Sequence, residues 1–453
     1  MSTNNTIKRR SFFKMIGTGT AALSSIVYAR AVTQSPLASS LLPPAPVETK
    51  MTTRLDPVTG KGVSILGYGG MRWPSKDRRI LQDKVNELID VAMKNGVNYY
   101  DTAPVYHNGQ SEKAMGESLR RYPRESYFIA TKLSNFNAND WSFERSKAIY
   151  DNSFKELGLD YIDFYLLHSV GPGKENFDKR FVNNGMLDFL QKERQEGRIR
   201  HLGFSYHGNR ESFLHALSLD VKWDFVQIQL NYYFDWLQDS DNRPSAEYLY
   251  EELTKRQIPV VVMEPLLGGR LAKLNDQLLA KLKERDPNQT PAAWAFRFAG
   301  SLPNILTVLS GMTYMEHLTE NIDTFSPLKP VSDADKTFLQ ETATAMMKYP
   351  TVPCTACRYC MPCPFNVDIP GNFAYLNKCI ENGNIPASRQ SANYTKARSS
   401  FLKKYSKSVP SKKQASHCTA CGQCMELCPQ HIKIPEQMKR INELVDKLQN
   451  NTL

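Results

Sequence analysis

The chain has 453 residues, a net charge of +11, nine cysteines, 41% hydrophobic residues and 10% aromatic residues. These ordinary proportions exclude a disordered, collagen-like or coiled-coil protein, and the length is enough for two or three domains. Residues 1–50 carry a charge of +5, residues 51–353 carry −2 and residues 354–453 carry +8, so the two basic ends need separate explanations.

The first 46 residues are expected to be a targeting segment and linker outside the fold. Lys8–Lys14 reads KRRSFFK and precedes Met15–Tyr28, a mildly apolar stretch too short and polar to span a membrane. Arg9-Arg10 followed by Ser, Phe, Phe and Lys resembles a bacterial twin-arginine export signal. The resemblance implies export by that pathway to a periplasmic or membrane-tethered location, and a frayed basic tail is the plain alternative.

From residue 64 onward, short β-branched or aromatic runs alternate with amphipathic runs such as Asp83–Lys94 and Ser142–Leu157. The expected strands are Ser64–Tyr68, Val97–Tyr100, Tyr127–Ala130, Ile162–Leu167, Ile199–Phe204, Phe225–Ile228, Pro259–Met263 and Ile305–Leu309. Regular alternation predicts a mostly parallel sheet. No Gly-x-Gly-x-x-Gly follows the first strand, which disfavours an open dinucleotide-binding sheet. We therefore predict an α/β fold in which eight βα units close into a (β/α)8 TIM barrel.

Four polar side chains lie where successive predicted strands end. Asp101 follows the second strand and Tyr106 comes five residues later, while Lys132 and His168 end the third and fourth strands. Each could have a structural role alone, and a lone strand-end histidine more often has one. Four such groups at one rim indicate a catalytic site, because buried charges and phenols are costly without a function.

In this pattern the chain, over roughly residues 51–328, resembles an aldo/keto reductase. The resemblance implies that Asp101, Tyr106, Lys132 and His168 are the catalytic residues. Tyr106 would donate the proton that a carbonyl oxygen needs as hydride arrives, and Lys132 would lower the pKa of this phenol. Asp101 would pair with Lys132, and His168 would orient or polarise the carbonyl.

The resemblance also implies NAD or NADP as a cofactor. The expected contacts are Ser205, Gln227, Met263, Gly268, Ser310 and Asn321. Met263 stands where the family commonly has an aromatic residue. Gly311 and His317 stand where NADP-using members have a lysine and an arginine, which weighs against strict use of NADP.

Eight of the nine cysteines fall in two runs. They are Cys354, Cys357, Cys360 and Cys363, then Cys418, Cys421, Cys424 and Cys428. The second run reads Cx2Cx2Cx3CP, which is typical of ferredoxin-type 4Fe–4S binding, and the first is a shortened variant. Zinc and disulfides are the alternatives. As in two-cluster ferredoxins, the last cysteine of each run is expected to bind the other cluster.

These patterns predict four parts. Residues 1–46 are the signal and linker, 51–328 the barrel, 329–353 a connecting helix, and 354–453 a small, mainly helical domain with two 4Fe–4S clusters. The positive charge of this domain partly offsets the negative clusters. Lys396–Lys413 could face an acidic redox partner or lipid headgroups, or be solvated surface. No element that reads a nucleic-acid groove is present, so nucleic acid is not an expected partner.

We predict a nicotinamide-dependent oxidoreductase that interconverts a carbonyl and an alcohol, with Tyr106 as general acid and base. The alternative is an exported electron-transfer or interaction protein built on an inactive barrel. The complete set of four catalytic residue types favours the enzyme. The sequence names no substrate beyond a small carbonyl or alcohol, for which sugars, polyols and steroid-like molecules are candidates.

Overall fold

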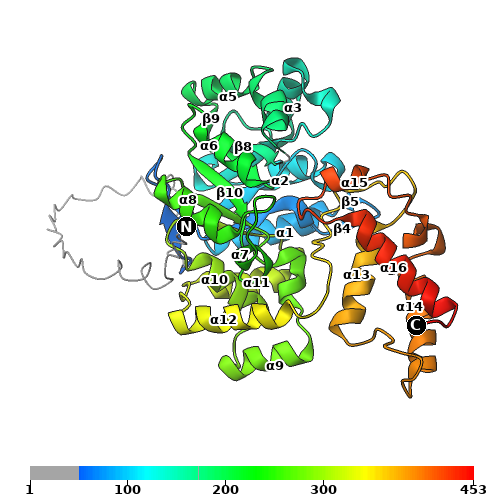
Figure 1. The fold of residues 1–453 in the computed structure, drawn as a ribbon. Helices are drawn as coiled ribbons and strands as arrows, with labels where there is room; N and C mark the ends of the chain where they lie inside the picture. The colour runs from blue at the N-terminus through cyan, green and yellow to red at the C-terminus, as the bar shows by residue number, and fades with distance from the viewer. Residues whose placement is uncertain (1–49, 172) are drawn as a thin grey trace, which may run out of the picture. The chain divides into compact units, whose positions relative to one another are not determined.

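The computed structural model describes residues 50–171 and 173–453. The expected export signal lies outside the described residues and stays a prediction. Figure 1 shows strands and helices alternating along the chain through the first two thirds of the described part. Within that part, no helix has both the length and the apolar character that crossing a bilayer requires.

Eight parallel strands form a closed barrel, which confirms the predicted α/β barrel fold. In spatial order they are β10, β11, β12, β3, β6, β7, β8 and β9. Their bounds are β3 Leu66–Gly69, β6 Tyr99–Asp101, β7 Phe128–Leu133, β8 Ile162–Val170, β9 Ile199–Tyr206, β10 Phe225–Gln229, β11 Val260–Met263 and β12 Ile305–Ser310. Each of the eight expected runs therefore contributes one barrel strand.

Two small antiparallel pairs were not expected from the sequence. Strand β1 (Thr53–Leu55) pairs with β2 (Gly62–Ser64) just before the barrel, and β4 (Ser75–Lys76) pairs with β5 (Arg79–Ile80) after β3. Both are too short to show the alternation of apolar and polar residues that reveals a strand in a sequence.

The helices that follow the barrel strands pack their apolar faces on the outside of the sheet. They are α1 Gln82–Lys94, α2 Ser111–Leu119, α3 Phe143–Leu157, α4 Lys174–Phe177, α5 Met186–Gln195, α6 Arg210–Ser218, α7 Phe234–Leu237, α8 Ala246–Lys255, α9 Asp276–Arg285, α10 Pro291–Gly300 and α11 Met315–Phe325. Local signals define their ends. The Ser142 hydroxyl caps α3 by accepting from Arg145 N, and Gly158, with φ +66°, ends that helix.

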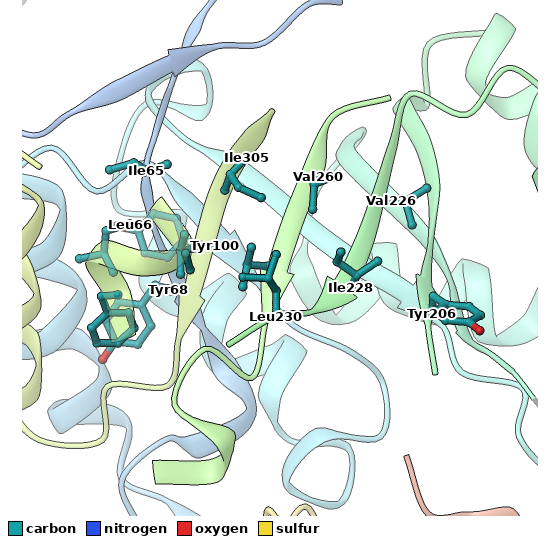
Figure 2. Packing of buried hydrophobic residues seen from close by; sticks show 14 of the residues in the cluster. Ile65, Leu66, Tyr68, Tyr100, Tyr206, Val226, Ile228, Leu230, Val260 and Ile305 are labelled. Carbon is teal, nitrogen blue, oxygen red and sulfur yellow. The ribbon is translucent and has the colours of Figure 1, made fainter. Parts of the chain in front are cut away.

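Alternate residues of each strand belong to two different cores. Val226 and Ile228 of β10 and Val260 of β11, which Figure 2 shows on neighbouring strands, belong to the cluster that includes the surrounding helices, whereas Phe225 and Val261 fill the interior of the barrel. Side chains of a strand point to opposite faces in turn. The register of each strand therefore decides which of its polar residues can reach the interior.

The region from residue 329 to the last residue is helical. Its helices are α12 Asp333–Met346, α13 Ile369–Glu381, α14 Tyr394–Ser408, α15 Gln423–Glu426 and α16 Ile434–Gln449. Leu339, Ala343 and Met346 of α12 join the apolar cluster between the barrel strands and their helices. In contrast, α13, α14 and α16 form a separate apolar core with the cysteine segments. The predicted mainly helical domain after the barrel is confirmed.

Candidate active site and cysteine groups

Asp101, Lys132 and His168 lie on the inner face of the barrel. The residue two positions before each of them packs in the interior cluster, so the alternation of side chains directs all three inward. They come from β6, β7 and β8, which are neighbours in the barrel. All three lie at or near the carboxyl ends of these parallel strands, so one end of the barrel collects them.

Asp101 and Lys132 form a buried ion pair. Lys132 Nζ lies 2.7 Å from both carboxylate oxygens of Asp101 and donates a third hydrogen bond to the carbonyl of Thr102 at 2.8 Å. Burial raises the pKa of Asp101 and lowers the pKa of Lys132, and each charge opposes the shift of the other. The three hydrogen bonds fix the ammonium group in one position.

Tyr106 begins a short 3₁₀ turn after β6, and its ring lies 5.2 Å from Lys132 Nζ. Burial raises the pKa of Tyr106 well above its ordinary value, and Tyr359 and Asp101 add to the shift. The expected lowering of this pKa by Lys132 is therefore not found. The physical reason is that burial of the Tyr106 phenol is the largest influence on its pKa, and that Tyr359 and Asp101 act in the same direction.

His168 is held as a neutral imidazole. Its Nδ1 lies 2.6 Å from the Ser134 hydroxyl, and its backbone carbonyl accepts a hydrogen bond from Arg180. Burial lowers the pKa of His168 well below its usual range, and the nearby charge of Lys132 lowers it further. A Ser134 hydroxyl that donates to Nδ1 would leave the ring proton on Nε2. The sequence analysis had singled out neither Ser134 nor Arg180.

Tyr359 completes this group, although it lies far away in the sequence. It stands between Cys357 and Cys360, and its phenol lies close enough to Tyr106 to raise the pKa of the Tyr106 hydroxyl further. The Tyr359 hydroxyl lies 3.5 Å from Nε2 of His168. No local sequence signal identifies Tyr359 as a site residue, because its only distinctive feature in the sequence is its place inside a cysteine run.

Three of the expected cofactor residues come from consecutive strands. Gln227 of β10 is the register partner of Ser205 on β9, and Met263 ends β11 with its side chain in the interior cluster. The Ser205 hydroxyl accepts from the backbone N–H of Ser169 at 2.8 Å. Among the described residues, Gln227 Oε1 is buried without a hydrogen-bond partner. A buried carbonyl oxygen of this kind fits the amide N–H of a nicotinamide.

The other three lie further along the chain. Asn321 of α11 donates to the Ser310 hydroxyl at the end of β12, at 2.9 Å. Gly268 has φ +67°, and its N–H donates to the Glu264 carboxylate at 2.6 Å. A Cβ at Gly268 would lie 2.5 Å from the carbonyl oxygen of Thr355. The glycine loop therefore packs directly against the first cysteine segment.

The eight cysteines of the two runs form two groups. Cys354, Cys357, Cys360 and Cys428 line one hollow. In the other group, burial raises the pKa of Cys424 to about 11, and the neighbouring Cys418, Cys421 and Cys363 add to the shift. All nine cysteines lie in the described part of the chain and are free. Each group takes three cysteines from one run and one from the other.

Among the described residues, no set of three His, Cys, Asp or Glu side chains is placed to hold a single metal ion, so the thiols of the first group would have to bind a larger metal centre. Burial raises the pKa of Cys354 to about 11 and that of Cys357 to about 12, and their neighbouring cysteines also contribute. Without a cation these thiols would stay protonated at neutral pH. Iron bound to them would supply the positive charge that stabilises thiolates.

Two family models match the chain. The model of the aldo/keto reductase family matches residues 65–336, more than half of the chain, and a 4Fe–4S dicluster domain matches residues 353–434. The second match supports iron–sulfur clusters over zinc or disulfides. The first implies a nicotinamide cofactor.

Curated relatives and solved structures agree with the first match. The chain is 26% identical to L-galactose dehydrogenase of Arabidopsis thaliana, over 65% of this chain and 94% of that protein. It is 27% identical to NADH-specific methylglyoxal reductase of Escherichia coli, over 63% and 94%. The fold matches the holo form of aldo-keto reductase AKR11C1 from Bacillus halodurans with a TM-score of 0.54 and 22% identity, over 64% and 96%. The chain belongs to the aldo/keto reductase family.

Proposed function

We propose that this oxidoreductase reduces a small carbonyl, or oxidises the matching alcohol, with NAD or NADP and with Tyr106 as general acid and base. The observation that supports it best is the convergence of the Tyr106 hydroxyl, His168 Nε2 and the Asp101–Lys132 pair at one end of the barrel. A bound nicotinamide would supply the hydride. The named activities of the relatives, on galactose and methylglyoxal, support a sugar or small aldehyde as the substrate class.

Each of the four residues has a task in this reaction. His168 Nε2–H would donate to the carbonyl oxygen, and Tyr106 would transfer its proton to the same oxygen as negative charge develops there. Lys132 would stabilise the phenolate that remains, and Asp101 keeps Lys132 charged and in place. Gln227 would accept from the carboxamide of the cofactor, beside Ser205.

This function is tested with anaerobically purified protein and a panel of small aldehydes and sugars. We expect the near-ultraviolet absorbance of NADH or NADPH to fall only when a carbonyl is added. The ratio of kcat/KM for the two cofactors then decides between them. No turnover by protein that binds the nucleotide would favour the alternative, an electron-transfer or interaction protein on an inactive barrel.

We further propose that the two cysteine groups hold two 4Fe–4S clusters, about eight iron and eight sulfide per chain. Cys360→Ala should then lose about four iron or more, measured by iron and acid-labile sulfide analysis. Cys379→Ala is the matched control and should keep the full content, because Cys379 is buried outside both groups. Zinc without sulfide, or full iron in Cys360→Ala, would contradict the assignment.

Export through the twin-arginine pathway and docking of a redox partner complete the proposal. Support for the partner comes from exposed apolar side chains next to the cysteines, namely Phe365, Met425 and Leu427, and from the basic helix α14. Support for export comes from the twin-arginine-like sequence within residues 1–46. The presence of bound cofactors is compatible with it, because that pathway carries folded proteins with their cofactors.

A further inference from the structure

The hydroxyl of Tyr359 lies beside two catalytic groups. It lies 3.5 Å from His168 Nε2, at the long end of hydrogen-bond distances, and the imidazole of His168 contacts the rings of both Tyr106 and Tyr359 edge to face. The Tyr359 phenol is also near enough to Tyr106 to raise the pKa of the Tyr106 hydroxyl. Under the proposed function, Tyr106 and His168 are the two groups that must contact the carbonyl oxygen of the substrate. The phenol beside both of them belongs to the second domain.

The ring of Tyr359 is packed as well as its hydroxyl. Its centroid lies 5.7 Å from that of Phe136 and 6.2 Å from that of the His168 imidazole, the latter edge to face. Aromatic pairs at such distances attract each other beyond the burial of their area. The phenol is therefore held over the catalytic residues by its ring as well as by its oxygen.

The segment that carries Tyr359 is anchored on the barrel. Arg72 Nη2 donates to the Thr355 carbonyl at 2.9 Å, and Gly268 has no side chain at the place where the Thr355 backbone approaches it. The same stretch is also tied to the second domain: the backbone of Val352 exchanges two hydrogen bonds of 2.7 Å with the buried Asn377 side chain of α13. These contacts fix the start of the segment, so the position of Tyr359 is a built feature of the fold.

We propose that Tyr359 is a specificity-determining residue of the active site. Its hydroxyl occupies the position that the carbonyl oxygen of the substrate takes when the substrate binds. A substrate binds by displacing this hydroxyl, because Tyr106 and His168 cannot direct the same hydrogen bonds to two oxygens. The Tyr359 and Phe136 rings then form the wall against which the rest of the substrate packs. Every substrate must shift the Tyr359 ring together with its hydroxyl, and small aldehydes require a smaller shift than branched or ring substrates. This inference rests on the proposed function for the roles of Tyr106 and His168.

Tyr359→Phe tests the inference, because it removes the hydroxyl and keeps the ring. One net hydrogen bond corresponds to about a tenfold change in affinity. We therefore expect kcat/KM for a small aldehyde to rise about tenfold, mainly through KM. The matched control is Tyr394→Phe in the same domain, whose buried hydroxyl has no partner among the described residues. It should leave kcat/KM unchanged.

A binding measurement separates this inference from the proposed function. Isobutyramide presents a carbonyl oxygen but is a poor hydride acceptor, so calorimetry reports the oxygen site without turnover. Its affinity should rise about tenfold in Tyr359→Phe and stay constant in Tyr394→Phe. If no variant reduces any carbonyl but the amide affinity still changes in this way, the proposed function fails and the inference stands.

Two results would overturn the inference. One is an unchanged affinity for isobutyramide in Tyr359→Phe, since the hydroxyl would then not compete for the site. The other is a tenfold loss of kcat/KM, which would make Tyr359 a participant in the reaction. Tyr359→Ala adds a test of the wall: the ratio of kcat/KM for a branched aldehyde to that for a linear one should rise. Iron content equal to that of the wild type shows that the cysteine segment is intact.

Discussion

Tyr106→Phe should reduce kcat by about 10²–10⁴-fold, the usual cost of removing a positioned general acid. Only one oxygen atom is lost, and the Tyr106 ring keeps its edge contact with the His168 imidazole, at 6.0 Å between centroids. We therefore expect nucleotide binding and thermal stability to stay near those of the wild type. Steady-state kinetics with a small aldehyde, together with a fluorescence titration of the nucleotide, measure both quantities.

Tyr99→Phe is a suitable control for this variant. Tyr99 is a buried tyrosine of the barrel interior at the start of β6, the strand that Asp101 ends, and its hydroxyl has no hydrogen-bond partner among the described residues. Its loss should leave kcat unchanged. Near-wild-type activity in Tyr106→Phe would show that another group supplies the proton, and Tyr359 would then be the first residue to test.

Asp101→Ala should lower the free energy of unfolding of the barrel by about 3–5 kcal/mol, because it leaves the Lys132 ammonium buried without its partner. All five tryptophans lie between residues 73 and 294. Tryptophan fluorescence during urea unfolding therefore reports the barrel separately from the cysteine domain. A change below about 1 kcal/mol would show that Lys132 is neutral or finds another partner.

The double variant Asp101→Ala/Lys132→Met separates stability from catalysis. Removing both charges leaves no unpaired ion, so most of the lost stability should return. Activity should not return, because the phenolate of Tyr106 would lack its neighbouring cation. Recovery of both properties in the double variant would show that the pair is structural only.

The sequence was sufficient to predict the barrel because its strands carry strong local signals. The run Ile162–Leu167 is apolar or aromatic at every position but Asp163, and the strand is buried along nearly its whole length, as a strand covered on both faces requires. Strands β1 and β2 have only three residues each, which is too short for such a run, so the sequence did not predict them. The packing of α12 on the barrel was not predictable for a different reason: it depends on contacts between residues that are distant in the sequence.

The candidate site was predictable only where its residues follow strands. Asp101, Lys132 and His168 each end an apolar run, and the parallel order of the strands gathers them. Tyr359 differs, because 191 positions separate it from His168 and only the folded cysteine segment brings it there. The direction of the Tyr106 pKa shift was missed for the same reason, since it depends on burial and on Tyr359.

The exchange of one cysteine between the two groups has a consequence for biosynthesis. Cys354, Cys357 and Cys360 share their hollow with Cys428, so this group cannot form until residues 361–427 have been synthesised. The three earlier thiols must stay reduced during that time, with the barrel sequence already outside the ribosome. The segment that carries Tyr359 is therefore shaped after the strands that hold Asp101, Lys132 and His168. The active site acquires its final form only when the ribosome has passed Cys428.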